Sequence, residues 1–234
     1  MNTMWVVKTM IAQFIIPVTL AVAHAPQSKE AGETERLRLP TPRLESAVSL
    51  ERALHQRRSV REFDSKRMIS LEEISQLLWS AQGITASGGF RTAPSAGALY
   101  PLEVYLVAGH VQNLPAGIYH YQPDGHQLRR VALGDRRKQI ARAALQQEAL
   151  YEAPATIVFS VIYERTTQKY RERGRQYALI EVGHAAQNVL LQAVALGLGA
   201  VPIGAFYDHE LRQVMGMKGH EEPIYLIPVG KKRS

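Results

Sequence analysis

The stretch from Tyr177 to Leu196 constrains the fold most strongly, because apolar residues cover most sides of the helix that it predicts. One apolar stripe comprises Ala178, Val182, Ala185, Val189, Ala193 and Leu196, and a second comprises Leu179, Ala186, Leu190 and Val194. A helix that is apolar around so much of its circumference is a buried central helix or part of a subunit interface. We interpret Glu181, His184 and Asn188, which follow helical spacing, as a structural hydrogen-bond cluster rather than a metal site.

The rest of the chain predicts short strands and helices in alternation. The β-branched run from Ala155 to Ile162 predicts a central strand that is covered on both faces. Further predicted strands are Val104–Val107, Gly117–Tyr121, Gln127–Val131 and Ile224–Val229, of which the second and third form a hairpin. Further predicted helices are Leu50–Arg57 capped by Ser49, residues 70–82 with a Ser70–Glu73 capping box, Asp135 to about Leu150, and Asp208–Met215 capped by Asp208. His120 and His126, in or beside the hairpin, are predicted to lie at the surface.

The amino-terminal segment has the features of an export signal. Residues 10–23 are mostly apolar, too short for a typical membrane span, and end in the small-x-small pattern Ala21-Val22-Ala23. We predict that residues 1–23 are a cleaved signal peptide, that residues 24–48 form a linker, and that the protein is periplasmic. The alternative is an uncleaved inner-membrane anchor, and only then would the protein contact a membrane.

Composition narrows the classes of function. The 234-residue chain is 46% apolar, which is enough for a sizeable core, and it contains no cysteine. Thiolate catalysis, disulfides and cysteine-ligated metals are therefore excluded. The net charge of +7 favours anionic ligands, but no nucleic-acid-binding motif accompanies it, so we expect no nucleic-acid partner and no metal.

Two segments have residue types that are suited to ligand binding, the first to a phosphate group and the second to a planar ring. The arginine segment, residues 57–61, places three guanidinium groups and a hydroxyl within five residues, which suits phosphate, although a solvated basic surface explains it better on charge alone. The proline loop, residues 94–101, is rich in small residues, so a planar ligand can approach its backbone. An ordinary loop before a strand explains it equally well.

A third segment, from Arg165 to Arg175, is polar and basic and contains Lys169-Tyr170. Its charge favours a mobile surface loop. The alternative is a proton-transfer pair that the loop holds over an active site.

The order of these segments resembles the FMN-dependent nitroreductase superfamily, and within it the SagB-type dehydrogenases, which are azoline oxidases of thiazole- and oxazole-modified peptide pathways. The resemblance covers about Leu50 to Arg233. Four pieces carry it: the arginine segment, the proline loop, Lys169-Tyr170 with the helix Tyr177–Asn188, and Gly197-Leu198-Gly199 with Pro202-Ile203-Gly204. Each piece alone is weak evidence for the family, but the four pieces in this order are strong evidence for it.

The resemblance implies a nitroreductase-like α+β fold over residues 49–234, with a mainly antiparallel sheet sandwiched by helices. It implies a homodimer with FMN at each subunit interface. The residues that it assigns to the phosphate are Arg57, Arg58, Ser59 and Arg61, joined by Lys231 or Arg233. Those that it assigns to the ring and ribityl chain are Pro94, Ser95, Ala96, Gly97, Ala98, Ile203, Gly204 and Ala205, with Gly97 and Ala98 as candidates for the partner subunit's site.

The resemblance also implies that Lys169 or Tyr170 takes a proton from a small-molecule or peptide substrate while flavin N5 takes the hydride. Two alternatives remain on the same scaffold. One is an extracytoplasmic nitro or quinone reductase that uses NAD(P)H as a transient reductant, since no resident nicotinamide motif is present. The other is a flavin-binding or flavin-degrading protein.

Overall fold

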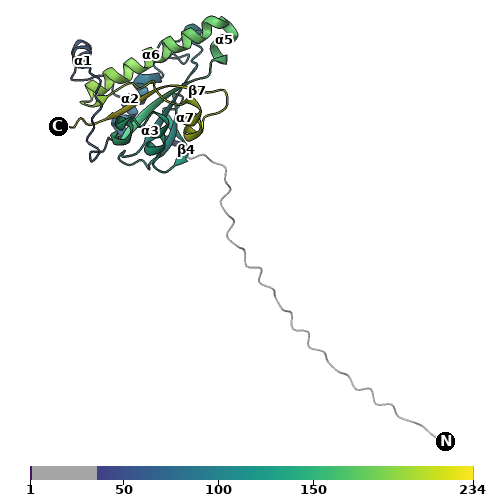
Figure 1. Cartoon of the computed structure of the whole chain (residues 1–234). Coiled ribbons are helices and arrows are strands. Elements are labelled where there is room, and N and C mark those ends of the chain that lie inside the picture. The colour runs from purple at the N-terminus through teal and green to yellow at the C-terminus, as the bar shows by residue number, and fades with distance from the viewer. Residues whose placement is uncertain (2–35, 234) are drawn as a thin grey trace. The chain divides into compact units, whose positions relative to one another are not determined.

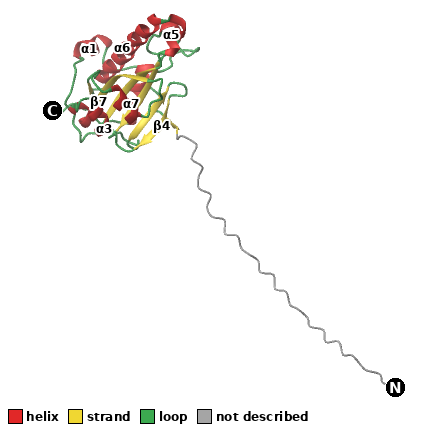
Figure 2. Ribbon diagram, turned by 45° about the vertical axis from the view of Figure 1, so that its right-hand side comes forward, coloured by secondary structure: helices red, strands yellow, loops and turns green. Residues whose placement is uncertain are grey.

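The computed structural model of the protein describes residue 1 and residues 36–233, so the predicted signal peptide and the first part of the predicted linker lie outside the described residues. In the described part, a seven-stranded sheet carries helices on both faces (Figures 1 and 2). The strand order is β1-β4-β3-β2-β5-β7-β6, and the paired strands are all antiparallel. The predicted α+β fold with a mainly antiparallel sheet is confirmed.

The strands are β1 (Arg36–Arg38), β2 (Leu102–Ala108), β3 (Gly117–Gln122), β4 (Gln127–Leu133), β5 (Ala155–Val161), β6 (Gly199–Ala200) and β7 (Glu222–Gly230). The helices are α1 (Leu50–Gln56), α2 (Leu71–Gln82), α3 (Arg137–Ala143), α4 (Glu148–Glu152), α5 (Glu164–Tyr170), α6 (Glu172–Ala195) and α7 (Asp208–Met215). A 3₁₀ turn, η1 (Ala96–Ala98), lies within the proline loop. No helix in the described part of the chain is long and apolar enough to cross a membrane.

Strand β5 is central, as its sequence predicts. All of its residues are buried, and it pairs with β2 on one side and β7 on the other. Its side chains alternate between two cores, as expected for a strand covered on both faces. Ile157 and Phe159 belong to the core beneath α2 and α6, whereas Val158 belongs to the core beneath α3 and α7.

Helix α6 has the central position that its apolar surface predicts. Ala178, Val182 and Ala185 are buried in the core that α6 shares with α2. Leu179 and Ile180 are nevertheless 46% and 48% exposed. One subunit therefore covers only part of the apolar surface of α6.

Side-chain caps begin the first two helices as predicted. The Ser49 hydroxyl accepts a hydrogen bond from the N–H of Arg52. Ser70 and Glu73 form the reciprocal capping box, with donor–acceptor distances of 3.1 and 2.9 Å. Each cap depends on residues that are three positions apart in the chain, so the sequence alone is enough to predict it.

The predicted linker is wrong at its carboxyl-terminal end, because Arg36 and the residues after it belong to the fold. Strand β1 pairs with β4, with Leu37 opposite Leu128. Leu39 is buried, and its N–H donates to the carbonyl of His126 at 3.0 Å. These contacts pair the backbone groups at the edge of β4. The charged composition of residues 36–38 gave no indication of a strand.

The predicted surface positions of His120 and His126 are also wrong, since both are half-buried. His126 lies 2.9 Å from the Tyr121 hydroxyl and 2.7 Å from the Ser75 hydroxyl. His120 contacts the carboxylate of Glu103. His126 in the turn and His120 in β3 are therefore part of the packing that joins the hairpin to α2 and β2.

The segment predicted as a charged loop is helical. It forms α5 and the start of α6, which are separated by Arg171 at φ 51°. Helix α5 buries only Thr166, so its sequence lacks the apolar stripe that identifies a helix. It packs closely on α6 because Gly174 has no side chain. A Cβ at that position would lie 2.7 Å from backbone atoms of Thr166 and Thr167.

The predicted helix from Asp135 to Leu150 is divided into α3 and α4. Leu145 and Gln146, between them, have φ values of 56° and 57°, which no helix permits. Apolar periodicity persists across the break because both helices pack into the same core. Asp208 begins α7 as its first helical residue, and Tyr207 is the N-cap.

The close approach of α5 to α6 predicts that Gly174→Ala destabilises the protein by about 1–3 kcal/mol, because the added methyl group meets backbone atoms that cannot move independently. Gln176→Ala, at an exposed position of the same helix, should change the free energy of unfolding by less than about 0.5 kcal/mol. Chemical denaturation of both variants measures the difference. Wild-type stability of Gly174→Ala would show that α5 is not packed in this way.

Candidate active site

The arginine segment lies along the β6 edge of the sheet. The Val60 N–H donates to the Ala200 carbonyl at 3.0 Å, and Ser59 bridges to the same residue. Arg57 is half-buried and Arg61 is exposed, and neither forms an ion pair with any described residue. This edge therefore presents two unpaired guanidinium groups beside a serine, which is a suitable set of donors for phosphate.

Arg58, also predicted to bind the phosphate, contacts the backbone at the end of α1. Its guanidinium group donates to the carbonyls of His55 and Arg57 at 3.0 and 2.8 Å. Carbonyls in the last turn of a helix lack intrahelical donors, so Arg58 satisfies the end of α1. It is engaged with its own backbone rather than turned toward a ligand.

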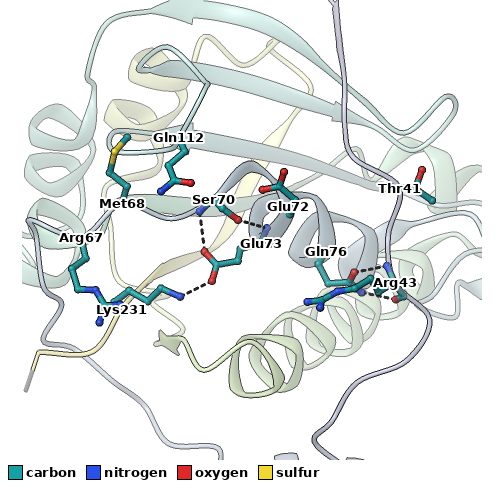
Figure 3. Close-up of a pocket in the computed structure, with 10 residues that line it drawn as sticks. All are labelled: Thr41, Arg43, Arg67, Met68, Ser70, Glu72, Glu73, Gln76, Gln112 and Lys231. Carbon is teal, nitrogen blue, oxygen red and sulfur yellow. Dashed lines mark hydrogen bonds and ion pairs between the residues drawn. The ribbon is translucent and has the colours of Figure 1, made fainter.

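The structure pairs the two predicted tail cations with acidic residues. Lys231 Nζ lies 2.5 Å from Glu73, and Arg233 forms an ion pair with Glu152. Lys231 and Glu73 line a cleft of about 690 Å³ at the start of α2. Figure 3 shows Lys231 directed at Glu73. The intervening Lys232 is exposed, has no acidic partner among the described residues, and lies beside Gly199. Successive side chains of an extended chain point to opposite sides, so the side chain of residue 232 points away from those of residues 231 and 233. The sequence alone could have indicated this difference.

The segment after β6 continues along the same edge. Ile203 exchanges backbone hydrogen bonds with Leu226 of β7 at 2.8 and 2.9 Å. Gly204 and Ala205 are exposed, and their N–H groups donate to no other described residue. The β6 edge therefore combines unpaired cations with free backbone donors.

The proline loop and Lys169-Tyr170 are in contact, although they are distant in the sequence. A Cβ placed on Gly97 would lie 2.7 Å from the Tyr170 hydroxyl and 3.0 Å from Lys169 Nζ. Gly97 has a φ of 63°, and Ala98 has a φ of 54°. Positive φ is costly for a residue other than glycine, so surrounding contacts must hold this turn.

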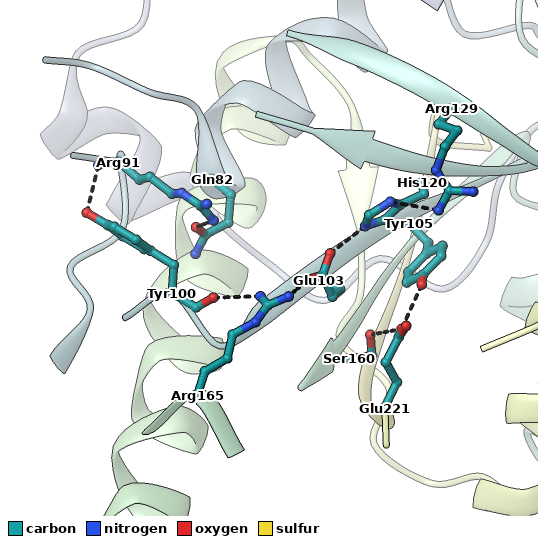
Figure 4. A network of polar contacts seen from close by, with 10 residues as sticks. All are labelled: Gln82, Arg91, Tyr100, Glu103, Tyr105, His120, Arg129, Ser160, Arg165 and Glu221. Atoms are coloured by element: carbon teal, nitrogen blue, oxygen red, sulfur yellow. Dashed lines mark hydrogen bonds and ion pairs between the residues drawn. The ribbon is translucent and has the colours of Figure 1, made fainter. Parts of the chain in front are cut away.

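Two side chains hold the turn. The Ser95 hydroxyl accepts the Tyr100 N–H at 2.9 Å, and Arg165 of α5 donates to the Tyr100 carbonyl at 2.9 Å. Arg165 also pairs with Glu103 at the start of β2, as Figure 4 shows. Burial raises the pKa of Glu103, but hydrogen bonds and charges from His120 and Arg165 outweigh it and lower the pKa below its usual value. Arg165 therefore links the helix that carries Lys169-Tyr170 to the proline loop.

Helix α6 contributes Glu181 to the same region. Glu181 is 2% exposed, accepts a hydrogen bond from Gln82 at 3.3 Å and interacts with Ser95. The predicted cluster of Glu181, His184 and Asn188 does not form, because His184 is exposed and Asn188 donates to the Thr92 carbonyl at 3.4 Å. The described residues contain no group of three or more side chains that could hold a metal ion.

The two halves of the candidate site lie along different parts of α6, with the proline loop beside its amino-terminal and middle turns and the arginine segment beyond its carboxyl-terminal end. Figures 1 and 2 show α1, which precedes the arginine segment, near one end of α6 and α5 at the other. Ser95 interacts with residue 181, whereas Ser59 bridges to Ala200, beyond the end of α6. The helix from residue 181 to residue 195 alone rises about 21 Å, at ~1.5 Å per residue. No hydrogen bond or strand bridge between the arginine segment and the proline loop is formed by the described residues.

Comparison with known proteins supplies independent evidence. A family model described as the nitroreductase family matches residues 54–231. A Methanocaldococcus jannaschii protein named as a nitroreductase is 44% identical over 201 residues, which cover 86% of this chain and 98% of the relative. The microcin B17-processing protein McbC of Escherichia coli is 34% identical over 161 residues, which cover 66% of this chain and 59% of McbC.

Solved structures give the same result. A protein of Ralstonia eutropha described as a nitroreductase superimposes with a TM-score of 0.75 and 30% identity, over 87% of this chain and 92% of that one. A chain of the E. coli microcin synthetase McbBCD complex with truncated pro-MccB17 bound gives a TM-score of 0.67 and 26% identity, over 95% of this chain and 85% of the matched chain.

The position of Arg165 predicts that Arg165→Gln loosens α5, because the Tyr100 carbonyl loses its donor and Glu103 loses a cation. A hydrogen bond to a charged group contributes about 1.5–3 kcal/mol, so amide hydrogen exchange in α5 should accelerate by at least about tenfold. Arg142→Gln, at an exposed position on α3, is the matched control and should leave this exchange unchanged. Equal exchange in both variants would contradict the positioning role.

Proposed function

This chain belongs to the nitroreductase family and, within that superfamily, to the SagB-type branch, and we propose that it is an FMN-dependent oxidoreductase that moves a hydride to or from flavin N5. The contact of Gly97 with Lys169 and Tyr170 carries the proposal, because it joins the two segments that distinguish the SagB-type pattern. The similarity to McbC supports the same assignment. This chain spans about three fifths of the length of McbC, so the activity and partners of the whole of McbC are not transferred.

The residues present fit the phosphate and ring edge of FMN. When bound, FMN supplies a ring that takes up or releases a hydride. Arg57, Ser59 and Arg61 would hold the phosphate through charge-assisted hydrogen bonds, and the free N–H groups of Gly204 and Ala205 would stabilise negative charge at the ring edge. The unpaired state of these donors favours an anionic ligand at the β6 edge.

We assign the tail's contribution to Lys232 rather than to Lys231 or Arg233. The latter two already neutralise Glu73 and Glu152, so turning either one toward a phosphate would leave a half-buried carboxylate without its cation. Lys232 has no acidic partner among the described residues, so it can turn toward a phosphate without breaking an ion pair.

Lys169 and Tyr170 would move the proton that accompanies hydride transfer. Dehydrogenation of a carbon–heteroatom bond releases a hydride to N5 and a proton to a base. The Tyr170 hydroxyl and Lys169 Nζ both approach the backbone of Gly97, so either can reach a substrate that lies against the proline loop.

We further propose a homodimer in which one subunit supplies the β6 edge and its partner supplies the proline loop with Lys169-Tyr170. No described hydrogen bond or strand bridge joins the arginine segment to the proline loop, so a partner subunit that supplies the second segment would complete the site. Leu179 and Ile180 of α6, with Leu50 and Leu54 of α1, expose apolar side chains that such a contact would cover.

The substrate class has two candidates. Similarity to McbC and to a chain of the McbBCD complex supports dehydrogenation of a thiazoline or oxazoline ring in a peptide. The M. jannaschii relative named as a nitroreductase, 98% of which this chain covers, supports the reductase alternative, for which we propose a nitro or quinone substrate and NAD(P)H as the reductant. These reactions differ in whether a base is needed at the hydride-transfer step.

If the arginine segment holds the phosphate, Arg57→Ala should weaken FMN binding on the order of ten- to hundredfold, since a hydrogen bond to a charged group contributes about 1.5–3 kcal/mol. Riboflavin, which lacks the phosphate, should bind nearly as it does to wild type. Fluorescence titration at two salt concentrations measures both, with exposed Arg52→Ala on α1 as the charge-matched control. Equal losses for FMN and riboflavin would refute the phosphate assignment.

The dehydrogenase candidate predicts that Lys169→Ala and Tyr170→Phe slow flavin reduction by an azoline peptide about 10²- to 10⁴-fold, which is the usual contribution of a general base. FMN content and reduction by NADH should stay close to wild type, because a nicotinamide delivers its hydride without such a base. Anaerobic bleaching of the flavin measures each rate, and exposed Arg173→Ala is the control. Unchanged bleaching by every substrate in both variants would leave only the reductase candidate.

We also propose export with removal of residues 1–23, on the strength of the apolar run that ends at Ala23. The intact mass of protein purified from its native host should correspond to a chain that begins at His24. A full-length mass in a soluble cytoplasmic fraction would refute the proposal.

A further inference from the structure

The carboxylate of Glu103 connects the hairpin of β3 and β4 to the proline loop, as Figure 4 shows. Its Oε1 atom accepts a hydrogen bond from Arg165 of α5, and its Oε2 atom lies 2.5 Å from Nε2 of His120 in β3. Arg165 in turn donates to the Tyr100 carbonyl at 2.9 Å. The side chains of Glu103 and His120 are each only 15% exposed. A carboxylate with so little access to water is destabilised if either oxygen loses its donor.

The imidazole ring of His120 is held in one orientation and one tautomer. Its Nδ1 atom lies 3.2 Å from Nη2 of Arg129. A guanidinium group can only donate, so Nδ1 accepts and carries no proton. The ring proton is therefore on Nε2, where it is directed at Glu103. The ring also packs against Tyr105, with 4.7 Å between the ring centroids, and the Tyr105 hydroxyl is fixed by a hydrogen bond to Glu221 at 2.6 Å.

These contacts form one continuous series from the hairpin to the proline loop. Each link joins two different elements: β4 to β3, β3 to β2, and β2 to α5. The loop depends on such outside contacts, because Ala98 within it has a positive φ. Arg165 also lies one helical turn before Lys169, so the same link holds the helix that carries the proposed proton-transfer pair. Without a donor at residue 120, the Glu103 carboxylate could rotate or take up a proton, and either change would weaken its hold on Arg165.

We propose that His120 is a positioning residue, which donates its Nε2 proton to Glu103 and thereby holds Arg165 and the proline loop in the conformation that accepts the flavin ring. The inference rests on the proposed function, which puts the proline loop at the ring or ribityl chain. A loop that is already held in its bound conformation loses less conformational entropy when the ligand binds. Removal of the donor should therefore weaken the binding of the flavin ring, although His120 does not touch the flavin.

Two amide substitutions test this role. The amide nitrogen of glutamine is as many bonds from Cα as imidazole Nε2, so His120→Gln keeps a donor for Glu103. The amide of asparagine reaches only as far as Nδ1, so His120→Asn removes that donor. Fluorescence titration with riboflavin should show affinity about tenfold weaker in His120→Asn, which His120→Gln largely restores. His209→Asn, at an exposed position on α7, is the control and should bind as wild type does.

A double-mutant cycle separates this role from a general loosening of the hairpin. If His120 acts through Arg165, His120→Asn should cause little further loss of riboflavin affinity in a protein that already carries Arg165→Gln. If His120 only stabilises the hairpin, the two losses should multiply. Full multiplication, or wild-type affinity in His120→Asn, would overturn the inference while the proposed function stands.

The tautomer of His120 can be measured in the wild-type protein, so the test does not depend on whether a variant folds. ¹⁵N NMR near neutral pH should show a ring that is protonated at Nε2 and not at Nδ1. A proton on Nδ1 would overturn the inference, because the donor to Glu103 would then not be fixed by Arg129. Failure of wild type to bind both riboflavin and FMN would overturn the proposed function and the inference together.

Discussion

The rigidity and length of α6 are the constraint on which the candidate site depends. This 24-residue helix packs on α2 and the sheet, so the segments attached to its two ends are held apart. The proline loop and α5 lie at its amino-terminal end, and the arginine segment lies beyond its carboxyl-terminal end. The chain presents the two halves of the proposed flavin site beside different parts of α6, and we propose that a second copy completes each site. The exposed apolar side chains of Leu179 and Ile180 lie beside the half that contains the proline loop, and the proposed second copy would cover them.

Charge placement gives the two halves different chemistry. Glu73 and Glu152 neutralise Lys231 and Arg233, which confines the unpaired positive charge at the β6 edge to the arginine segment and Lys232. At the other end, Arg165 is committed to the proline loop and β2, and Lys169 is the amine beside Gly97. The β6 edge is thus suited to an anion, and the proline loop to proton transfer.

Local signals predicted most of the fold. The Ser70–Glu73 capping box and strand β5 depend on residues that are near one another in the chain, and both have the predicted form. Helix α5 was missed because its position depends on Gly174 of the next helix, which allows a close approach that no periodicity records. The break between α3 and α4 was missed because the apolar pattern continues across it.

The sequence predicted which segments form the candidate site, but it did not predict which side chains contact one another. The order of the four segments identified the family, and the contact of Gly97 with Tyr170 agrees with their expected association. The ion pairs of Lys231 and Arg233 depend on acids in α2 and α4, and the environment of Glu181 depends on Gln82 in α2. Such pairings form only when separate elements pack together, so a single sequence does not reveal them.

Mixing two inactive subunits tests the composite site most directly. Arg57→Ala damages the β6 edge and Lys169→Ala damages the other half, so a dimer of one variant with the other has one site with both changes and one site with neither. At an FMN concentration too low to load Arg57→Ala, random pairing of equal amounts in a two-fold symmetric dimer should restore about one quarter of the wild-type rate of flavin reduction by an azoline peptide. If each site were built within a single subunit, every site in the mixture would carry a damaged half, and the mixture would be no more active than its components.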